Sequence, residues 1–155
     1  MKKHFLLIAM MLLGVISIKA QKIEREWVDL GLASGTLWAA QPEEGYYTYD
    51  EAREAFGGQI PSEWQWNELI KSCYIEYTYG KRSLLKLTGK KGNTLVIQST
   101  GLMDSSSKPH DLDKFSFWAF NTAHYDSKYA FVFGNLMEVM QTKKSYRYAV
   151  LLVNK

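Results

Sequence analysis

Residues 62–80, SEWQWNELIKSCYIEYTYG, decide the fold class, because the spacing of the apolar residues changes within them. The first half carries one apolar stripe at i, i+3, i+4 and i+7, formed by Trp66, Leu69, Ile70 and Cys73. This spacing predicts a helix with one buried face. Ser62 and Gln65 fit a capping box, so we expect the helix to begin just after Ser62. From residue 74 the pattern alternates, which predicts a strand that ends at Gly80.

A second, shorter helix is predicted directly upstream of this stretch. Thr48 and Glu51 form another capping box. Apolar residues then follow at helical spacing, namely Ala52, Ala55 and Phe56. The two glycines at 57–58 are expected to end this helix, because glycine readily adopts the backbone conformation that follows a helix C-terminus.

The rest of the chain is dominated by strand patterns. The predicted strands are residues 27–32, 36–40, 84–88, 94–98, 115–120, 129–133, 136–142 and 146–153. Gly134 and Asn135 predict a tight two-residue turn. In the last segment we expect Tyr148, Val150 and Leu152 to share one face. Strands, two helices and then antiparallel strands indicate an α+β domain, with two short helices packed on a twisted antiparallel sheet.

The first twenty residues have the layout of a secretory signal peptide. Two lysines precede an uncharged apolar run at 5–18, and Ala20 offers a small residue just before the expected cleavage site at Gln21. The run is shorter than the ~20 residues that a membrane-spanning helix needs. We therefore predict a signal peptide at 1–20, a single domain at 21–155 and an exported protein of the periplasm or cell surface, without stable membrane insertion.

The charge balance argues against a nucleic-acid partner. The 19 basic residues include Lys2, Lys3 and Lys19 of the leader, so the remaining chain carries 16 basic and 16 acidic side chains. A neutral surface does not attract nucleic acid or an anionic membrane. Cys73 is the only cysteine, which excludes an internal disulfide. Its place on the helical stripe predicts a buried thiol rather than a nucleophile.

No stretch predicts a metal or cofactor site. Gln41-Pro42-Glu43 is similar to a calcium motif of sugar-binding lectins, but it lies early in the chain and has no later partner, which favours a simple proline turn. The segment at 101–114 holds three aspartates and His110 at a spacing that matches no metal-ligand pattern. A solvated loop is favoured there over a metal site.

The best candidates for ligand contact are Trp118, Asn121 and Tyr125. An aromatic face beside an amide is typical of carbohydrate and peptide grooves. The alternative is that Trp118 belongs to the core and the other two cap a strand. His124 lies in the same segment, but no serine or cysteine nucleophile accompanies it, so we predict no catalytic residues and no enzyme activity.

Four stretches together resemble one protein family. They are WVDLGLASGTLWA at 27–39, AFGGQIP at 55–61 with WNEL at 66–69, LTGKKGN at 87–93, and Phe117-Trp118. They are similar to the exported paralogous domain named for Fibrobacter succinogenes, which is common in gut Bacteroidetes. The resemblance implies a C-type-lectin-like fold, related to that of formylglycine-generating enzymes. The chain departs from the family pattern at Ala33, where proline is usual, and at Ala119 and Phe120, where two serines are usual.

These observations predict an exported, non-catalytic binding domain at the bacterial cell envelope. It would recognise a protein or a glycan through an aromatic-rich surface, without a cofactor. One alternative is a structural or protective periplasmic subunit that docks on another protein. The other is an enzyme of the formylglycine-generating type, which is disfavoured because Cys73 does not match the paired reactive cysteines of those relatives.

Overall fold

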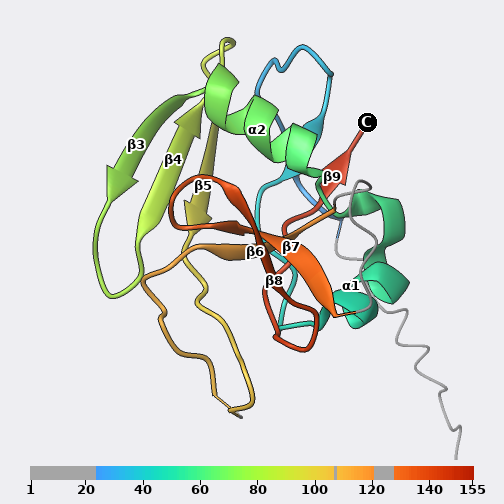
Figure 1. The fold of residues 1–155 in the computed structure, drawn as a ribbon. Coiled ribbons are helices and arrows are strands. Elements are labelled where there is room, and N and C mark those ends of the chain that lie inside the picture. Colours follow the sequence, from blue (N-terminus) through green and yellow to red (C-terminus); the bar gives the residue numbers. More distant parts are fainter. Residues whose placement is uncertain (1–23, 107, 121–127) are drawn as a thin grey trace, which may run out of the picture.

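The computed structural model describes residues 24–106, 108–120 and 128–155, which form two α-helices, one 3-10 helix and nine strands (Figure 1). The helical elements are α1 (Tyr49–Phe56), η1 (Gly57–Gln59) and α2 (Glu63–Ser72). The strands before residue 100 are β1 (Trp27–Asp29), β2 (Leu37–Ala39), β3 (Tyr74–Thr78), β4 (Leu84–Thr88) and β5 (Thr94–Gln98). The later strands are β6 (Ser116–Ala119), β7 (Tyr129–Gly134), β8 (Val139–Lys143) and β9 (Val153–Asn154). The predicted α+β composition is confirmed.

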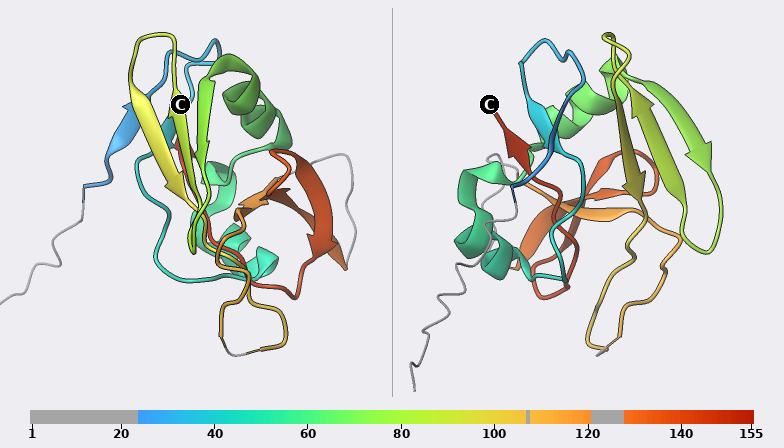
Figure 2. Two further views of the ribbon diagram at one scale, coloured as in Figure 1. Left: turned by 90° about the vertical axis from the view of Figure 1, so that its left-hand side faces the viewer. Right: turned by 180° about the vertical axis from the view of Figure 1, so that it is seen from behind.

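The strands form three small antiparallel sheets rather than the one twisted sheet that we expected. Their strand orders are β1-β2-β9, β3-β4-β5 and β6-β7-β8. β9 pairs with β2, whose other neighbour is β1, so the two ends of the described chain meet in one sheet (Figure 2). The strands of these sheets are only two to six residues long, and one shared core of apolar side chains holds the sheets together.

Both capping boxes form as predicted, and they set where the helices begin. The Thr48 hydroxyl accepts from the Glu51 backbone N–H, and the Glu51 carboxylate accepts from the Thr48 N–H. Ser62 and Gln65 make the same reciprocal pair at the start of α2. Gly57, with φ of +53°, ends α1, because a side chain is rarely tolerated at positive φ. These local signals therefore fixed the helix positions.

The apolar stripe of α2 packs on the β6-β7-β8 sheet and on β2. Trp66 is 1% exposed and Leu69 is fully buried, whereas Ile70 and Cys73 are half-buried. The Trp66 indole lies parallel to the Phe133 ring, with centroids 4.2 Å apart, and it also contacts Trp38 at 4.7 Å. The stripe prediction is thus confirmed for α2. In α1 only Ala52 is buried, and Ala55 is exposed, contrary to expectation.

The stretches 27–39 and 87–93 contact each other across the domain. The Cβ that an alanine would add at Gly89 falls 2.0 Å from the Leu30 carbonyl oxygen, so the β4–β5 turn approaches β1 as closely as backbone allows. The Asn93 amide donates to the Asp29 carbonyl at 2.8 Å, and Lys91 forms an ion pair with the Asp29 carboxylate at 2.7 Å. These polar contacts therefore join the β1-β2-β9 sheet to the β3-β4-β5 sheet.

Two of the predicted strand boundaries are wrong for physical reasons. The turn between β7 and β8 is not the two-residue Gly134-Asn135 turn, because Phe133 pairs with Val139 and Met137 adopts φ of +58°. Asn135 faces the neighbouring sheet instead, and its side-chain oxygen lies 3.4 Å from both the Tyr77 hydroxyl and the Phe115 N–H. The longer loop lets Asn135 make these contacts.

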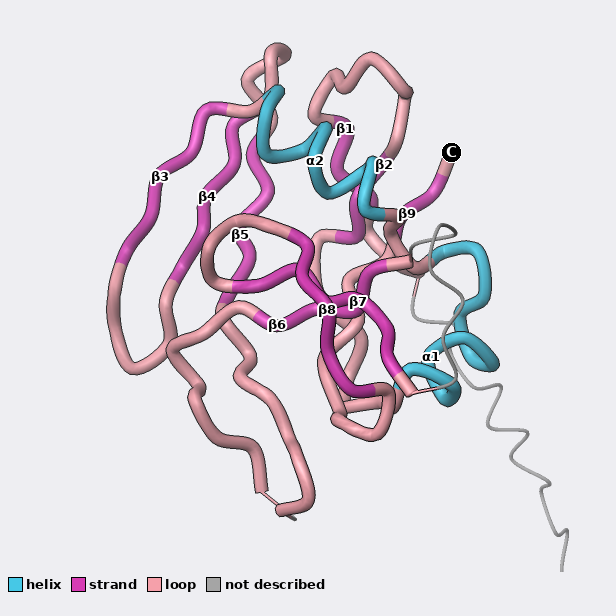
Figure 3. The backbone as a smooth tube through the Cα atoms, in the orientation of Figure 1, coloured by secondary structure: helices cyan, strands magenta, loops and turns pink. Residues whose placement is uncertain are grey.

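The predicted strand at 146–153 is mostly irregular, and only Val153 belongs to a strand. Residues 148–153 are all buried, so the segment has no solvent-facing side, and the expected one-faced pattern is wrong. Its backbone pairs in turn with Tyr47, with Trp118 and with Ala39. The segment runs between the sheets as a central connector (Figure 3), which explains why both its faces are apolar.

Candidate functional site

Of the three residues predicted to contact a ligand, the structure describes only Trp118. Trp118 is fully buried, and its indole Nε1 donates to the Tyr47 carbonyl at 2.7 Å. Tyr49 and Tyr148 meet its ring edge-on, with centroids at 5.3 and 4.7 Å. Trp118 is therefore a core residue that offers no ring face to a ligand. Asn121 and Tyr125, like His124, Ala20 and Gln21, lie outside the described residues, and their predicted roles stay predictions.

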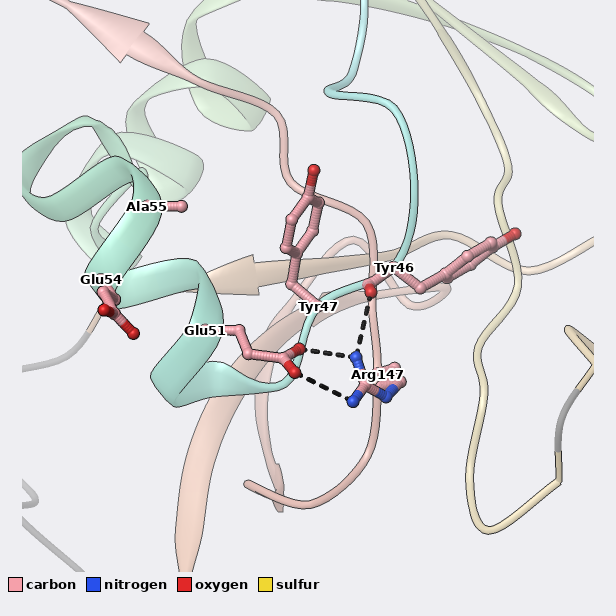
Figure 4. A pocket seen from close by; sticks show the side chains of 6 residues that line it. All are labelled: Tyr46, Tyr47, Glu51, Glu54, Ala55 and Arg147. Atoms are coloured by element: carbon pink, nitrogen blue, oxygen red, sulfur yellow. Dashed lines mark hydrogen bonds and ion pairs between the residues drawn. The ribbon is translucent and has the colours of Figure 1, made fainter.

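A groove beside α1 does bring an aromatic ring together with polar groups (Figure 4). It has a volume of about 420 Å³ and lies where α1, the segment 46–47 and Arg147 meet. Its lining residues are Tyr46, Tyr47, Glu51, Glu54, Ala55 and Arg147. The Tyr47 ring stands between α1 and the C-terminal segment of the chain, while Tyr46 points away from α1 (Figure 4). The groove is shallow and mostly open to solvent.

A bidentate ion pair joins the two sides of the groove. The Arg147 Nη1 donates to Glu51 Oε2 at 2.6 Å, and its Nη2 donates to Glu51 Oε1 at 2.9 Å. Nη1 also lies 3.4 Å from the Tyr46 carbonyl oxygen. The Thr48 backbone N–H and then the Arg147 guanidinium lower the pKa of Glu51 below its ordinary value. Both side chains stay more than a third exposed, so a ligand in the groove can reach them.

The Tyr47 ring is held rigidly as a wall of the groove. Its hydroxyl donates to the Glu44 carbonyl at 2.6 Å, and its ring meets Phe56 edge-on at 5.2 Å. Its backbone N–H and C=O both pair with Tyr148 at 3.0 Å. Burial raises the pKa of the Tyr47 hydroxyl, and Glu43 and Glu44 add to that shift. The ring therefore stays neutral and fixed before any ligand arrives.

The other side of the groove is anchored equally well. The Tyr46 hydroxyl donates to the Thr100 carbonyl at 2.5 Å. Arg147 exchanges two backbone hydrogen bonds with Met103, at 2.7 and 2.9 Å. A site built from anchored groups loses little conformational entropy on binding, which favours affinity.

The loop at 101–114 projects from the body of the domain (Figures 1 and 3). In it, His110 Nε2 lies 3.2 Å from an Asp104 oxygen, and its Nδ1 lies 3.3 Å from an Asp111 oxygen. The two carboxylates therefore face opposite nitrogens of the ring and do not converge on one point. Within the described residues, no group of three or more side chains is arranged to hold a metal ion. The Ser106 N–H is the main cause of a lowered pKa at Asp104.

The other residues singled out from the sequence have ordinary settings. Cys73 is half-buried at the C-terminus of α2, and burial, with Glu68, raises the pKa of its thiol. A raised thiol pKa leaves little thiolate to act as a nucleophile. Glu43, in the Gln41-Pro42-Glu43 turn, pairs with Arg25 at 2.8 Å. This turn lines a second hollow of about 460 Å³ with residues 24–26.

Sequence reasoning missed the Glu51–Arg147 pair, although it used Glu51 as a helix-capping residue. The two residues are 96 positions apart, and no local pattern links them. The same carboxylate both caps α1 and holds Arg147, so its capping role hid its second role. Only the path of the central connector places Arg147 beside α1.

Comparison of the chain with protein-family models, with curated proteins and with solved structures found no match. The resemblance described above is therefore neither supported nor opposed by a relative. Across the part of the chain that the structure describes, no helix has the length and apolar character needed to span a membrane.

Proposed function

We propose that this chain is an exported, non-catalytic binding domain of the bacterial cell envelope, with a C-type-lectin-like fold, that recognises a glycan or a protein in the groove beside α1. The leader-like layout of residues 1–20 and the resemblance at 27–39 support export and the fold. The groove supports binding. A concave site with one rigid aromatic wall and a few placed polar groups is typical of ligand-binding sites.

The observation that carries the proposal is the meeting of the Tyr47 ring with the Glu51–Arg147 pair in one groove. The ring supplies apolar surface, and the pair supplies hydrogen-bond donors and acceptors side by side. Neither acidic group in the groove faces a histidine, serine or cysteine among its lining residues. The Glu51 carboxylate is already held by the Thr48 N–H and by Arg147, so it is not free to take up or release a proton, and the groove fits binding better than chemistry.

The test is to screen the protein against glycan and peptide arrays and to repeat every positive with two variants. Tyr47→Leu removes the aromatic wall but keeps apolar volume, and it should abolish the signals. Tyr74→Ser, on an exposed side chain of the β3-β4-β5 sheet, is the matched control and should keep them. Circular dichroism confirms that both variants fold. An absence of any signal from either array, or signals that survive Tyr47→Leu, would overturn the proposal.

A second candidate, a structural subunit that docks on another protein, is favoured by the β3-β4-β5 sheet. The strands alternate so that Leu85, Leu87, Leu95 and Ile97 face the core. The outward side includes Tyr74 at 71%, Leu84 at 37% and Val96 at 46% exposure. Signals lost with Tyr74→Ser and kept with Tyr47→Leu would favour this second function.

A further inference from the structure

We infer that the ligand of the groove beside α1 is a neutral, hydroxyl-rich ring, the pyranose unit of an uncharged glycan. This inference rests on the proposed binding function and narrows it to one chemical class. It follows from which polar atoms of the groove are already used and which are free.

The Arg147 guanidinium is not available to bind an anion. A free arginine fork binds carboxylate or phosphate through two parallel hydrogen bonds. Here that fork is already filled by the two carboxylate oxygens of Glu51, at 2.6 and 2.9 Å. An acidic ligand would have to displace Glu51, and Glu51 is held in addition by the Thr48 N–H at 2.9 Å. An anionic sugar or peptide terminus therefore finds no free two-pronged guanidinium face.

The remaining charge in the groove also disfavours an anion. Three charged side chains line it, and the charges of Glu51 and Arg147 offset each other. The Glu54 side chain is exposed and has no hydrogen bond or ion pair within the described residues, so no partner neutralises its charge. The groove therefore carries one net negative charge, which repels uronate, phosphate and carboxylate groups.

The free polar atoms match hydroxyl groups. Glu51 Oε1 accepts one hydrogen bond, from Arg147, and an ionised carboxylate oxygen can accept a second. Arg147 has five N–H groups, and three of them have acceptors among the described residues. A free donor thus lies beside a free acceptor. Neighbouring hydroxyls of a sugar, each able to donate and accept, satisfy both at once.

The wall of the groove fits the apolar side of such a ring. The Tyr47 ring is anchored through its hydroxyl and its backbone, and the exposed Ala55 methyl lies across from it on α1 (Figure 4). The C–H face of a sugar ring gains dispersion and hydrophobic energy from packing on an aromatic ring. A lysine side chain could pair with Glu54, but it would leave the adjacent Arg147 and Glu51 groups without partners, and such unpaired groups lower affinity.

The experiment compares three tetrasaccharides of matched length by isothermal titration and by amide chemical-shift mapping. They are a neutral glucan, a tetragalacturonate and a fully deacetylated glucosamine tetramer. We expect the neutral oligomer to bind, with the shifted amides confined to residues 46–55 and 146–148. The anionic oligomer should bind about tenfold more weakly, which corresponds to about 1.4 kcal/mol. Glu54→Gln should narrow that gap about threefold, since it removes one nearby charge. Asp113→Asn removes one exposed carboxylate that does not line the groove and should leave the gap unchanged.

Equal or tighter binding of the uronate, or binding of the cationic tetramer alone, would overturn the inference while the binding function stands. A peptide from the array whose shifts map to the groove would do the same. If no glycan or peptide shifts the groove amides, the proposed function itself fails. Shifts that appear only on the β3-β4-β5 sheet would overturn both and favour the docking role.

Discussion

The indole of Trp66 and the ring of Phe133 lie parallel within 1°, with their centroids 4.2 Å apart, and this stack joins α2 to the β6-β7-β8 sheet. Trp66 also meets Trp38 at 4.7 Å, so a single side chain on α2 bridges two of the three sheets. Because these sheets are small and share no strand, the contacts of such side chains must supply most of the cohesion between them.

Replacing Trp66 with alanine should therefore destabilise the fold strongly. Truncation of a fully buried tryptophan typically costs about 3–5 kcal/mol of unfolding free energy. Trp64 lies two residues earlier on the same helix but is 60% exposed, and Trp64→Ala should change stability by less than about 0.5 kcal/mol. Urea unfolding followed by circular dichroism measures both. Equal losses for the two variants would show that α2 does not bury the Trp66 face.

The close approach of Gly89 to Leu30 gives a second stability prediction. A Cβ at residue 89 would lie 2.0 Å from a backbone oxygen, and backbone cannot rotate away as a side chain can. Gly89→Ala should therefore lower the free energy of unfolding by more than the roughly 1 kcal/mol that an average substitution costs. A Cβ at Gly58 would point into open space, with no contact within 4 Å, and this glycine has no positive φ, so Gly58→Ala should be neutral or slightly stabilising. Thermal unfolding of both variants measures these changes. An unchanged stability of Gly89→Ala would refute the close contact between the β4–β5 turn and the residue that follows β1.

Local signals were enough to place the helices, and they failed where distant segments meet. Ser62 and Thr48 satisfy backbone groups within four residues, so their roles can be seen in the sequence. The segment 148–153 is apolar on both faces because it is buried between β2, β6 and the chain around Tyr47, which a one-faced strand pattern does not reveal. The groove depends on this segment, since it carries Arg147 to Glu51. The candidate site therefore had no local signature.

Acid should weaken the contact between α1 and the central connector. The pKa of Glu51 in the folded protein lies below its ordinary value of 4.5, chiefly through the Thr48 N–H and then through Arg147. A carboxylate whose folded pKa is lowered contributes stability above its unfolded pKa and loses that contribution as pH falls through the folded pKa. The difference in unfolding free energy between the wild type and Glu51→Gln should thus reach its largest value near pH 6 and shrink below pH 4.5.

Urea unfolding at a series of pH values between about 3 and 7 measures this difference. Glu54→Gln is the control, because it removes a carboxylate from the same helix that takes part in no described ion pair. The difference in unfolding free energy between Glu54→Gln and the wild type should not shrink in the same way as the pH falls. A Glu51→Gln difference that stays constant with pH would show that the carboxylate is not held by Thr48 and Arg147 in solution.

Cys73 should react slowly in the folded protein. Its thiol is half-buried, and burial together with the nearby Glu68 carboxylate raises its pKa, so little thiolate is present at neutral pH. Thiolate is the reactive form, and alkylation by iodoacetamide at pH 7.5 should therefore be slower in the native protein than in urea. Because this is the only cysteine, mass spectrometry of the intact protein gives the rate directly. Native labelling as fast as unfolded labelling would contradict the buried, raised-pKa thiol and would reopen the possibility of a reactive Cys73.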